Sequence, residues 1–201
     1  MMLTIARLQS FYDQLKSGLE DSTIVIGGGA VYDTLNGRPV RDLDVYVQSP
    51  FDWDTGTEDL KEDISNTVTW FNRTYYTSGK CLSKSDIDKK NYGTVSVQTV
   101  WHWDHTIGDL PVDMIFVSKP PSEYIETEFS FGLCQAWVGH YGLRTTRAYW
   151  RDSLNRTITF MLDHKVGTPA HDKCREHALK LKLKYPDWKF RNITPTNPHS
   201  L

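Results

Sequence analysis

The 201-residue chain has little cysteine and no long hydrophobic run. Its three cysteines (Cys81, Cys134 and Cys174) are odd in number and widely spaced, which fits neither a disulfide framework nor a zinc site. No apolar run approaches the ~20 residues that cross a bilayer, and the first residues lack the features of a secretory signal. We therefore expect reduced thiols, no membrane partner and a cytoplasmic location.

Length and composition favour one folded domain. Hydrophobic residues make up 39% of the chain and charged residues 24%, so we expect a packed core. The length of 201 residues suits a single domain. We interpret residues 1–201 as one domain, with a catalytic core at 1–120 and a C-terminal extension at 121–201.

Acidic and basic residues are unevenly distributed along the chain. Residues 1–140 carry 11 Lys and Arg against 20 Asp and Glu, a net charge of −9. Residues 141–201 carry 12 Lys and Arg against 5 Asp and Glu, a net charge of +7. A basic C-terminal segment favours a phosphate-bearing partner, and a merely solvated basic surface explains the asymmetry equally well.

Hydrophobic spacing predicts a mixed α/β fold, in which helices pack on a small sheet. Apolar residues at three- and four-residue intervals predict a helix at 3–17 and another that begins at a capping box formed by Thr55 and Glu58. Thr168-Pro169 begins a basic helix that reaches about Tyr185. Residues 129–160 hold further β-like runs. Alternating and β-branched residues predict four strands, at 23–26, 43–47, 95–101 and 112–117.

Three glycines, Gly27, Gly28 and Gly29, end the first predicted strand, and a short helix is predicted directly after them at Ala30–Leu35. Glycine lets the backbone approach a ligand closely because no Cβ intrudes. N–H groups that open into a helix N-terminus bind phosphate oxygens. Many strand-to-helix turns carry glycine for geometric reasons alone, so the motif gains weight only from the acidic residues that come after it in the chain.

Two carboxylates, Asp42 and Asp44, lie at the start of the second predicted strand. They are two residues apart in an extended segment, which places both side chains on one face of the sheet. Carboxylates this close repel each other unless a cation lies between them. Magnesium prefers carboxylates, water and substrate phosphates, so the pair suggests a Mg²⁺ site. Two exposed aspartates on an edge strand are the alternative.

A third carboxylate, Asp113, interrupts the apolar run at 112–117. An unpaired charge in such a strand is costly, so a metal-binding role is its best explanation. Asp104 and Asp109 compete for this role, but both fall in the stretch 102–111, which we expect to be the turn-rich connection between two strands.

The segment GGGAVYDTLNGRPVRDLDV resembles the first active-site segment of the polymerase-beta-like nucleotidyltransferase superfamily. It is most similar to the head of tRNA CCA-adding enzymes and bacterial-type poly(A) polymerases. The close match runs from Gly27 to Val45, and the strand with Asp113 extends it loosely to about half of the chain. The shared pattern is Gly28-Gly29, Val31-Tyr32-Asp33, Gly37-Arg38-Pro39 and Asp42-Leu43-Asp44.

This resemblance implies transfer of a nucleoside monophosphate from an NTP, such as ATP, to a hydroxyl group, with release of pyrophosphate. Gly28 and Gly29, next to Gly27, would hold the triphosphate. Arg38 and Arg41 are close to Asp42 and Asp44 in the sequence, which by itself allows them to orient these carboxylates, to meet phosphate or to form plain surface pairs. Two Mg²⁺ ions, or Mn²⁺ in their place, would bind to Asp42, Asp44 and Asp113. The third of these carboxylates would also help to deprotonate the acceptor.

Several departures from the tRNA enzymes argue against CCA addition. Tyr32 stands where those enzymes carry arginine, and no later Arg-Arg-Asp or Glu-Asp-x-x-Arg element is found. The helical neck and body that measure tRNA are also missing. The segments FGLCQAW, TTRAYWRD and NRTITF are similar instead to small nucleotidyltransferases encoded by bacteriophages, which would place the protein in the host cytoplasm.

The acceptor stays open between an RNA or tRNA end, a protein side chain and a small molecule. A toxin or an antitoxin would share the chemistry and differ only in its target. The alternative from another class is a catalytically silent protein of the same fold that binds a host or partner protein. Intact glycines and carboxylates argue against that alternative, because a scaffold has no need for clustered acids.

Three further groups of residues each allow two interpretations. A structural or surface role in a turn is favoured over metal binding for His102 and His105. The loop lysines either cover phosphates as a flap or are simply solvated; they are Lys84, Lys89 and Lys90. Aromatic residues near the expected site either stack on bases or fill the core; they are Tyr92, Trp101 and Trp103.

Overall fold

The computed structural model describes residues 1–48, 58–83, 87, 96–162 and 168–191. The chain divides into two compact units. The first unit comprises Met1–Thr127 and Ala136–Arg144, and the second comprises Glu128–Gln135 and Thr145–Leu201. Among the described residues, none of the helices combines the length and the apolar character needed to span a membrane.

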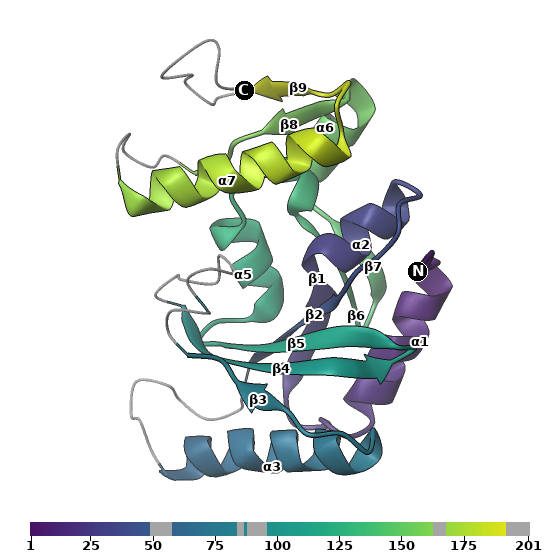
Figure 1. The fold of residues 1–201 in the computed structure, drawn as a ribbon, viewed down its shortest axis with the longest axis vertical. Helices are drawn as coiled ribbons and strands as arrows, with labels where there is room; N and C mark the ends of the chain where they lie inside the picture. The colour runs from purple at the N-terminus through teal and green to yellow at the C-terminus, as the bar shows by residue number, and fades with distance from the viewer. Residues whose placement is uncertain (49–57, 84–86, 88–95, 163–167, 192–201) are drawn as a thin grey trace. The chain divides into compact units, whose positions relative to one another are not determined.

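The first unit is built on a seven-stranded mixed sheet (Figure 1). Its order is β3-β4-β5-β2-β1-β6-β7. β2 and β5 pair in parallel, whereas β1 pairs antiparallel with β2 and β6, and β4 pairs antiparallel with β3 and β5. The predicted mixed sheet packed by helices is therefore confirmed. The strands are β1 (Thr23–Gly27), β2 (Leu43–Gln48), β3 (Lys80–Cys81), β4 (Val97–Ile107), β5 (Leu110–Val117), β6 (Ala136–Gly139) and β7 (Gly142–Thr145).

Helices α1 (Ile5–Lys16) and α2 (Gly28–Leu35) pack on the sheet at β1 and β6. The Thr4 side chain caps α1 by accepting a hydrogen bond from the Arg7 N–H at 3.2 Å. The buried side of α1 has the predicted three- and four-residue spacing, with Leu8, Phe11, Tyr12 and Leu15. Tertiary burial of this apolar stripe therefore holds α1 where the sequence predicted a helix.

Two further helices lie on opposite sides of the sheet (Figure 1). On α3 (Glu58–Thr74), the Phe71 ring lies 4.4 Å from that of Trp103 on β4. On α5 (Pro121–Glu128), the Tyr124 ring lies 5.4 Å from that of Tyr46 on β2. Both faces of the central strands are thereby buried, which explains why β5 is apolar along most of its length.

The connection between β4 and β5 is shorter than predicted. We expected residues 102–111 to form a turn, but β4 continues to Ile107, and only Gly108 and Asp109 separate it from β5. Both turn residues have φ of 62°, the conformation of a type I′ hairpin turn. Side chains alternate between the two faces of a strand, and in β4 the fully buried Trp103 occupies one of these faces. Its indole N–H donates to Asn72 Oδ1 at 2.8 Å, which anchors the middle of the longer strand.

The second unit combines helices with a parallel pair of strands, β8 (Thr157–Thr159) and β9 (Lys189–Arg191). The predicted helix at Thr168-Pro169 is confirmed as α7 (Pro169–Lys184), with the Thr168 side chain as its N-cap. Between residues 129 and 160 the structure has less strand than expected. A 3₁₀ turn occupies Gly132–Cys134, and α6 spans Arg147–Asn155.

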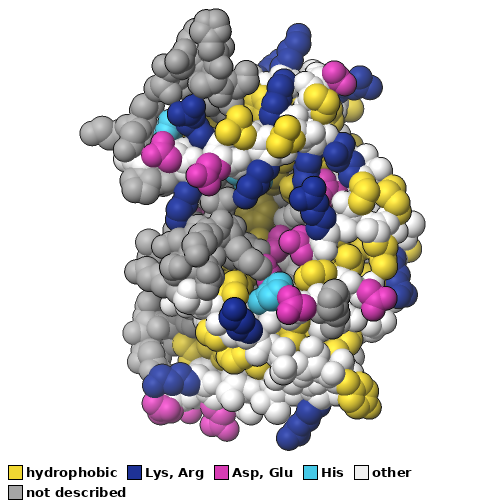
Figure 2. Space-filling view, in the orientation of Figure 1, with side chains coloured by type: hydrophobic (Ala, Val, Ile, Leu, Met, Phe, Trp, Pro, Cys, Tyr) yellow, Lys and Arg dark blue, Asp and Glu magenta, His cyan; other side chains and the backbone are white. Residues whose placement is uncertain are grey.

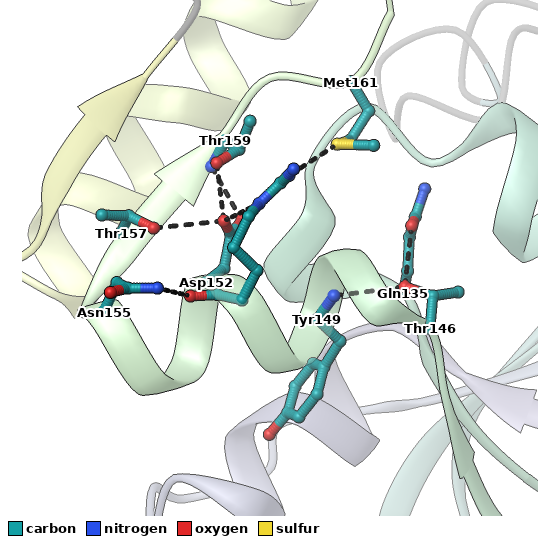
Figure 3. Close-up of polar contacts among 9 residues, drawn as sticks. Gln135, Thr146, Tyr149, Asp152, Asn155, Thr157, Thr159 and Met161 are labelled. Carbon is teal, nitrogen blue, oxygen red and sulfur yellow. Dashed lines mark hydrogen bonds and ion pairs between the residues drawn. The ribbon is translucent and has the colours of Figure 1, made fainter.

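A buried carboxylate, Asp152, joins α6 to β8 (Figure 3). It is fully buried and accepts hydrogen bonds from Thr157 Oγ1 at 3.1 Å, from Thr159 Oγ1 at 2.6 Å and from the Thr159 N–H at 2.8 Å. Gly132 approaches so closely that an added Cβ would lie 2.7 Å from Asp152 Oδ2. Three hydrogen bonds from two threonines make this residue the polar centre of the second unit.

We expect Asp152→Ala to destabilise the protein by about 2–4 kcal/mol, because it leaves two hydroxyls and one backbone N–H buried without their acceptor. The measurement is urea unfolding followed by circular dichroism. Asn155→Ala, at an exposed position on the same helix, is the matched control and should change stability by less than about 0.5 kcal/mol. Equal effects of the two substitutions would contradict the assigned role of Asp152.

Candidate active site

A single row of paired residues crosses four strands of the first unit. Gly27 on β1 pairs with Asp44 on β2, Asp44 pairs with Asp113 on β5, and Asp113 pairs with His102 on β4. Residues that pair directly across a sheet point their side chains to the same face. The register therefore brings together two acids and a histidine from segments up to 69 residues apart in the sequence.

The glycine turn lies directly against the Asp44 carboxylate. Gly28 has φ of 61°, a conformation that favours glycine, and a Cβ added there would lie 2.4 Å from Asp44 Oδ2. At Gly29 the nearest atom to an added Cβ is 3.8 Å away. Gly28 is thus required by the close approach of backbone and carboxylate, whereas Gly29 has room for a side chain.

The three predicted acids differ in burial. Asp113 is 2% exposed, Asp44 is partly buried, and Asp42 is exposed one residue before β2 begins. The structure places Asp44 and Asp113 side by side on neighbouring strands, and Asp42 precedes Asp44 by two residues on the same chain segment. Arg38 and Arg41 lie in the connection between α2 and β2, with Arg41 exposed.

His102 is the neighbour of Asp113 that the sequence interpretation missed. Its Nδ1 lies 2.5 Å from Asp113 Oδ1, and its Nε2 lies 2.9 Å from Asp104 Oδ1. We had placed His102 and His105 in a turn, and that placement is wrong because both lie in β4. Strand alternation would have revealed the arrangement, since a buried Trp103 turns the residue before it to the opposite face.

The competing acids occupy other positions. Asp109 lies in the two-residue hairpin turn, away from the row. The Asp104 side chain is 86% exposed and lies beside the row, with its Oδ1 2.9 Å from His102 Nε2. Of the aromatic candidates, Trp103 is fully buried against Phe71. Trp101, on the same strand, is partly buried, with its ring 6.3 Å from that of Trp103. The third aromatic candidate, Tyr92, and the loop lysines Lys84, Lys89 and Lys90 lie outside the described residues.

The paired carboxylates suit a hard divalent cation. In the described parts of the chain, no three His, Cys, Asp or Glu side chains are arranged to share one ion. Magnesium sites commonly use only one or two protein carboxylates and take their other ligands from substrate phosphates and water. The donor set of Asp44 and Asp113 fits that pattern, with the backbone of Gly28 in contact with the Asp44 carboxylate.

Solved structures with this fold include CCA-adding enzymes. The Thermotoga maritima CCA-adding enzyme complexed with tRNA has a TM-score of 0.60 and 14% identity, over 94% of this chain and 43% of that chain. A CCA-adding enzyme with ATP has a TM-score of 0.58 and 15% identity, over 94% of this chain and 39% of its own. An apo tRNA-processing enzyme has a TM-score of 0.55 and 17% identity, over 94% and 44% respectively.

These likenesses show a nucleotidyltransferase-type fold. The chain spans less than half the length of the enzymes it matches. No protein-family model and no curated protein matches the sequence. The likeness is thus one of architecture.

We expect Gly28→Ala and Gly29→Ala to have opposite effects on stability. The first forces a Cβ into positive φ, which costs about 1–2 kcal/mol, and also displaces the Asp44 carboxylate. The second adds a methyl group that meets only ordinary van der Waals contacts at the start of α2, and it should be neutral or stabilising by up to about 1 kcal/mol. Thermal unfolding measures both, and a Gly28→Ala protein as stable as Gly29→Ala would refute the close contact.

Proposed function

We propose that this protein is a metal-dependent nucleotidyltransferase, which transfers a nucleoside monophosphate from an NTP to a hydroxyl acceptor. The observation that carries the proposal is the cross-strand row in which a glycine turn, Asp44 and Asp113 meet at one face of the sheet. Phosphate oxygens and a divalent cation need these two kinds of group next to each other. The fold shared with CCA-adding enzymes agrees with the proposal.

Each part of the site has a role in this reaction. The N–H groups of Gly28 and Gly29, at the N-terminus of α2, would hold triphosphate oxygens. Asp44 and Asp113, with Asp42, would hold Mg²⁺ or Mn²⁺, as two ions when substrate is bound. These ions would supply neutralisation of phosphate charge and alignment of the reacting groups.

The proposed transfer is a displacement at the α-phosphorus of the NTP. The acceptor hydroxyl oxygen forms a bond to the α-phosphorus, and the bond from this phosphorus to the oxygen that bridges it to the β-phosphorus breaks. Pyrophosphate leaves with that bridging oxygen. The hydroxyl proton passes to the Asp113 carboxylate, which accepts it as a general base.

We infer that the acceptor is the end of an RNA strand, because α6 of the second unit exposes a basic and aromatic face. Arg147, Trp150, Arg151 and Leu154 are exposed at three- and four-residue intervals, with Trp150 55% and Leu154 77% exposed. The acid on this helix, Asp152, is fully buried and faces β8. An exposed indole between guanidinium groups suits a base that stacks and a backbone that carries phosphate.

Helix α7 of the same unit is also basic, and its positive charge comes from lysine and arginine side chains, not from His177. Burial and the nearby Lys180 and Lys184 lower the pKa of His177 to about 4, so this histidine is neutral at pH 7. The basic side chains of α7 are Lys173, Arg175, Lys180, Lys182 and Lys184. Figure 2 shows such basic side chains interspersed with hydrophobic ones over the elements of the second unit.

Substitution of Asp44 tests the reaction. We expect wild-type protein to gain thermal stability with Mg²⁺ and ATP together, because ligands that bind only the folded state stabilise it. Asp44→Asn should lose this gain and should lower transfer of label from α-³²P-NTPs to an RNA acceptor roughly a hundredfold or more. Thermal melts and gel analysis of the labelled RNA provide the two measurements.

Asp21→Asn, at an exposed acid of the same unit, is the matched control and should behave as wild type. A catalytically silent scaffold would be indifferent to Mg²⁺ and NTP in every variant. That result, together with the absence of labelled product, would refute the proposed function.

The α6 face is tested separately through binding. Trp150→Ala should weaken binding to a single-stranded oligoribonucleotide by roughly tenfold, since base stacking contributes about 1–3 kcal/mol. Fluorescence anisotropy measures the affinity, while the thermal shift with Mg²⁺ and ATP should not change.

Trp150→Phe should restore most of the RNA affinity because it retains a stacking surface. Tyr76→Ala removes an aromatic side chain that is 97% exposed in the other unit, and should have no effect. Unchanged RNA affinity in Trp150→Ala would exclude α6 as the RNA-binding face.

A further inference from the structure

We propose that His102 is a positioning residue that fixes the Asp113 carboxylate in the orientation required for binding of the divalent cation. This inference rests on the proposed function, because it concerns a ligand of the same site. It goes beyond that function by giving a role to a residue outside the glycine and aspartate motifs.

Backbone pairing keeps the two side chains together. His102 and Asp113 are direct partners in the antiparallel ladder of β4 and β5, so their side chains leave the sheet on one face. The His102 side chain is 22% exposed and that of Asp113 is 3% exposed. Nδ1 lies 2.5 Å from Oδ1, within hydrogen-bond distance. The contact is thus a partly buried feature of the sheet.

The chemistry of the pair determines which atom donates. An ionised carboxylate can only accept, so the His102 nitrogen that faces Asp113 carries the hydrogen. The torsion that rotates an aspartate carboxylate has broad preferences and does not by itself select one orientation. A donor held by the neighbouring strand therefore fixes the plane of the carboxylate next to Asp44. Carboxylates that bind metal ions are commonly held in this way by hydrogen bonds from neighbouring groups.

The second contact of His102 should matter less. The Asp104 side chain is 86% exposed, and ion pairs in such positions are worth little. Asp104→Ala therefore tests whether loss of a nearby negative charge by itself changes the need for Mg²⁺, because this substitution leaves the contact between His102 and Asp113 in place.

A purely structural role is the competing explanation. His102 satisfies a buried acid, so its removal would lower stability whether or not a metal ever binds. The two explanations differ in the concentration of Mg²⁺ that the protein needs. Only the positioning role makes this concentration depend on the atom with which residue 102 donates.

The experiment measures the thermal shift with ATP at fixed concentration while MgCl₂ is varied. We expect His102→Ala to raise the Mg²⁺ concentration at half-maximal shift by about 10-fold or more, as for other partners of metal ligands. His102→Asn should recover most of the wild-type value, because its Nδ2 occupies the place of Nδ1. His102→Gln, which presents its amide near the place of Nε2, should not recover it.

Each outcome decides between the explanations. If His102→Ala melts at a lower temperature without ligands but needs the wild-type Mg²⁺ concentration, the role is structural and the inference is wrong. Equal recovery by Asn and Gln, or a shift in Asp104→Ala as large as that in His102→Ala, would also overturn it. If the wild-type protein shows no response to Mg²⁺ and ATP, the proposed function fails first and this inference with it.

Discussion

The parallel pairing of β2 with β5 is the constraint on which the candidate site depends. In this register Asp44 is the direct partner of Asp113, and one residue of slippage would turn one of the two carboxylates to the opposite face. Apolar neighbours hold the register, because Leu43, Val45, Val112 and Met114 are fully buried on the other face. The same hydrophobic contacts that stabilise the sheet therefore hold two like charges next to each other.

Two carboxylates in such positions repel each other, and the surrounding groups offset this cost. Gly28 brings backbone to the Asp44 carboxylate, where any side chain would collide. His102 brings a ring nitrogen to Asp113 from the other side. The site is thus flanked by groups suited to negative charge at both ends of the row, which agrees with a function in binding phosphates and their cations.

The second unit has a different property, an exposed basic and aromatic face on α6.

Much of the fold could be predicted from local patterns. The spacing of Leu8, Phe11, Tyr12 and Leu15 predicted α1, and Thr168-Pro169 predicted the start of α7. The prediction for residues 102–111 was wrong because polar residues such as His102 and Asp104 suggested a turn. Buried Trp103 and pairing with β5 extend the strand to Ile107. Residues 129–160 were expected to hold further β-like runs, but part of this stretch forms α6, where burial of Tyr149 and Asp152 stabilises a helix.

The sequence by itself determined the glycine turn, the pair Asp42 and Asp44, and the acid within an apolar run, because each depends on residues only a few positions apart. The tertiary structure alone decided which of three acids lies beside Asp44, that Gly28 rather than Gly29 has no room for a side chain, and that His102 contacts Asp113. The physical reason is the range of the interactions. Hydrophobic periodicity is local, whereas strand register joins residues far apart in the chain.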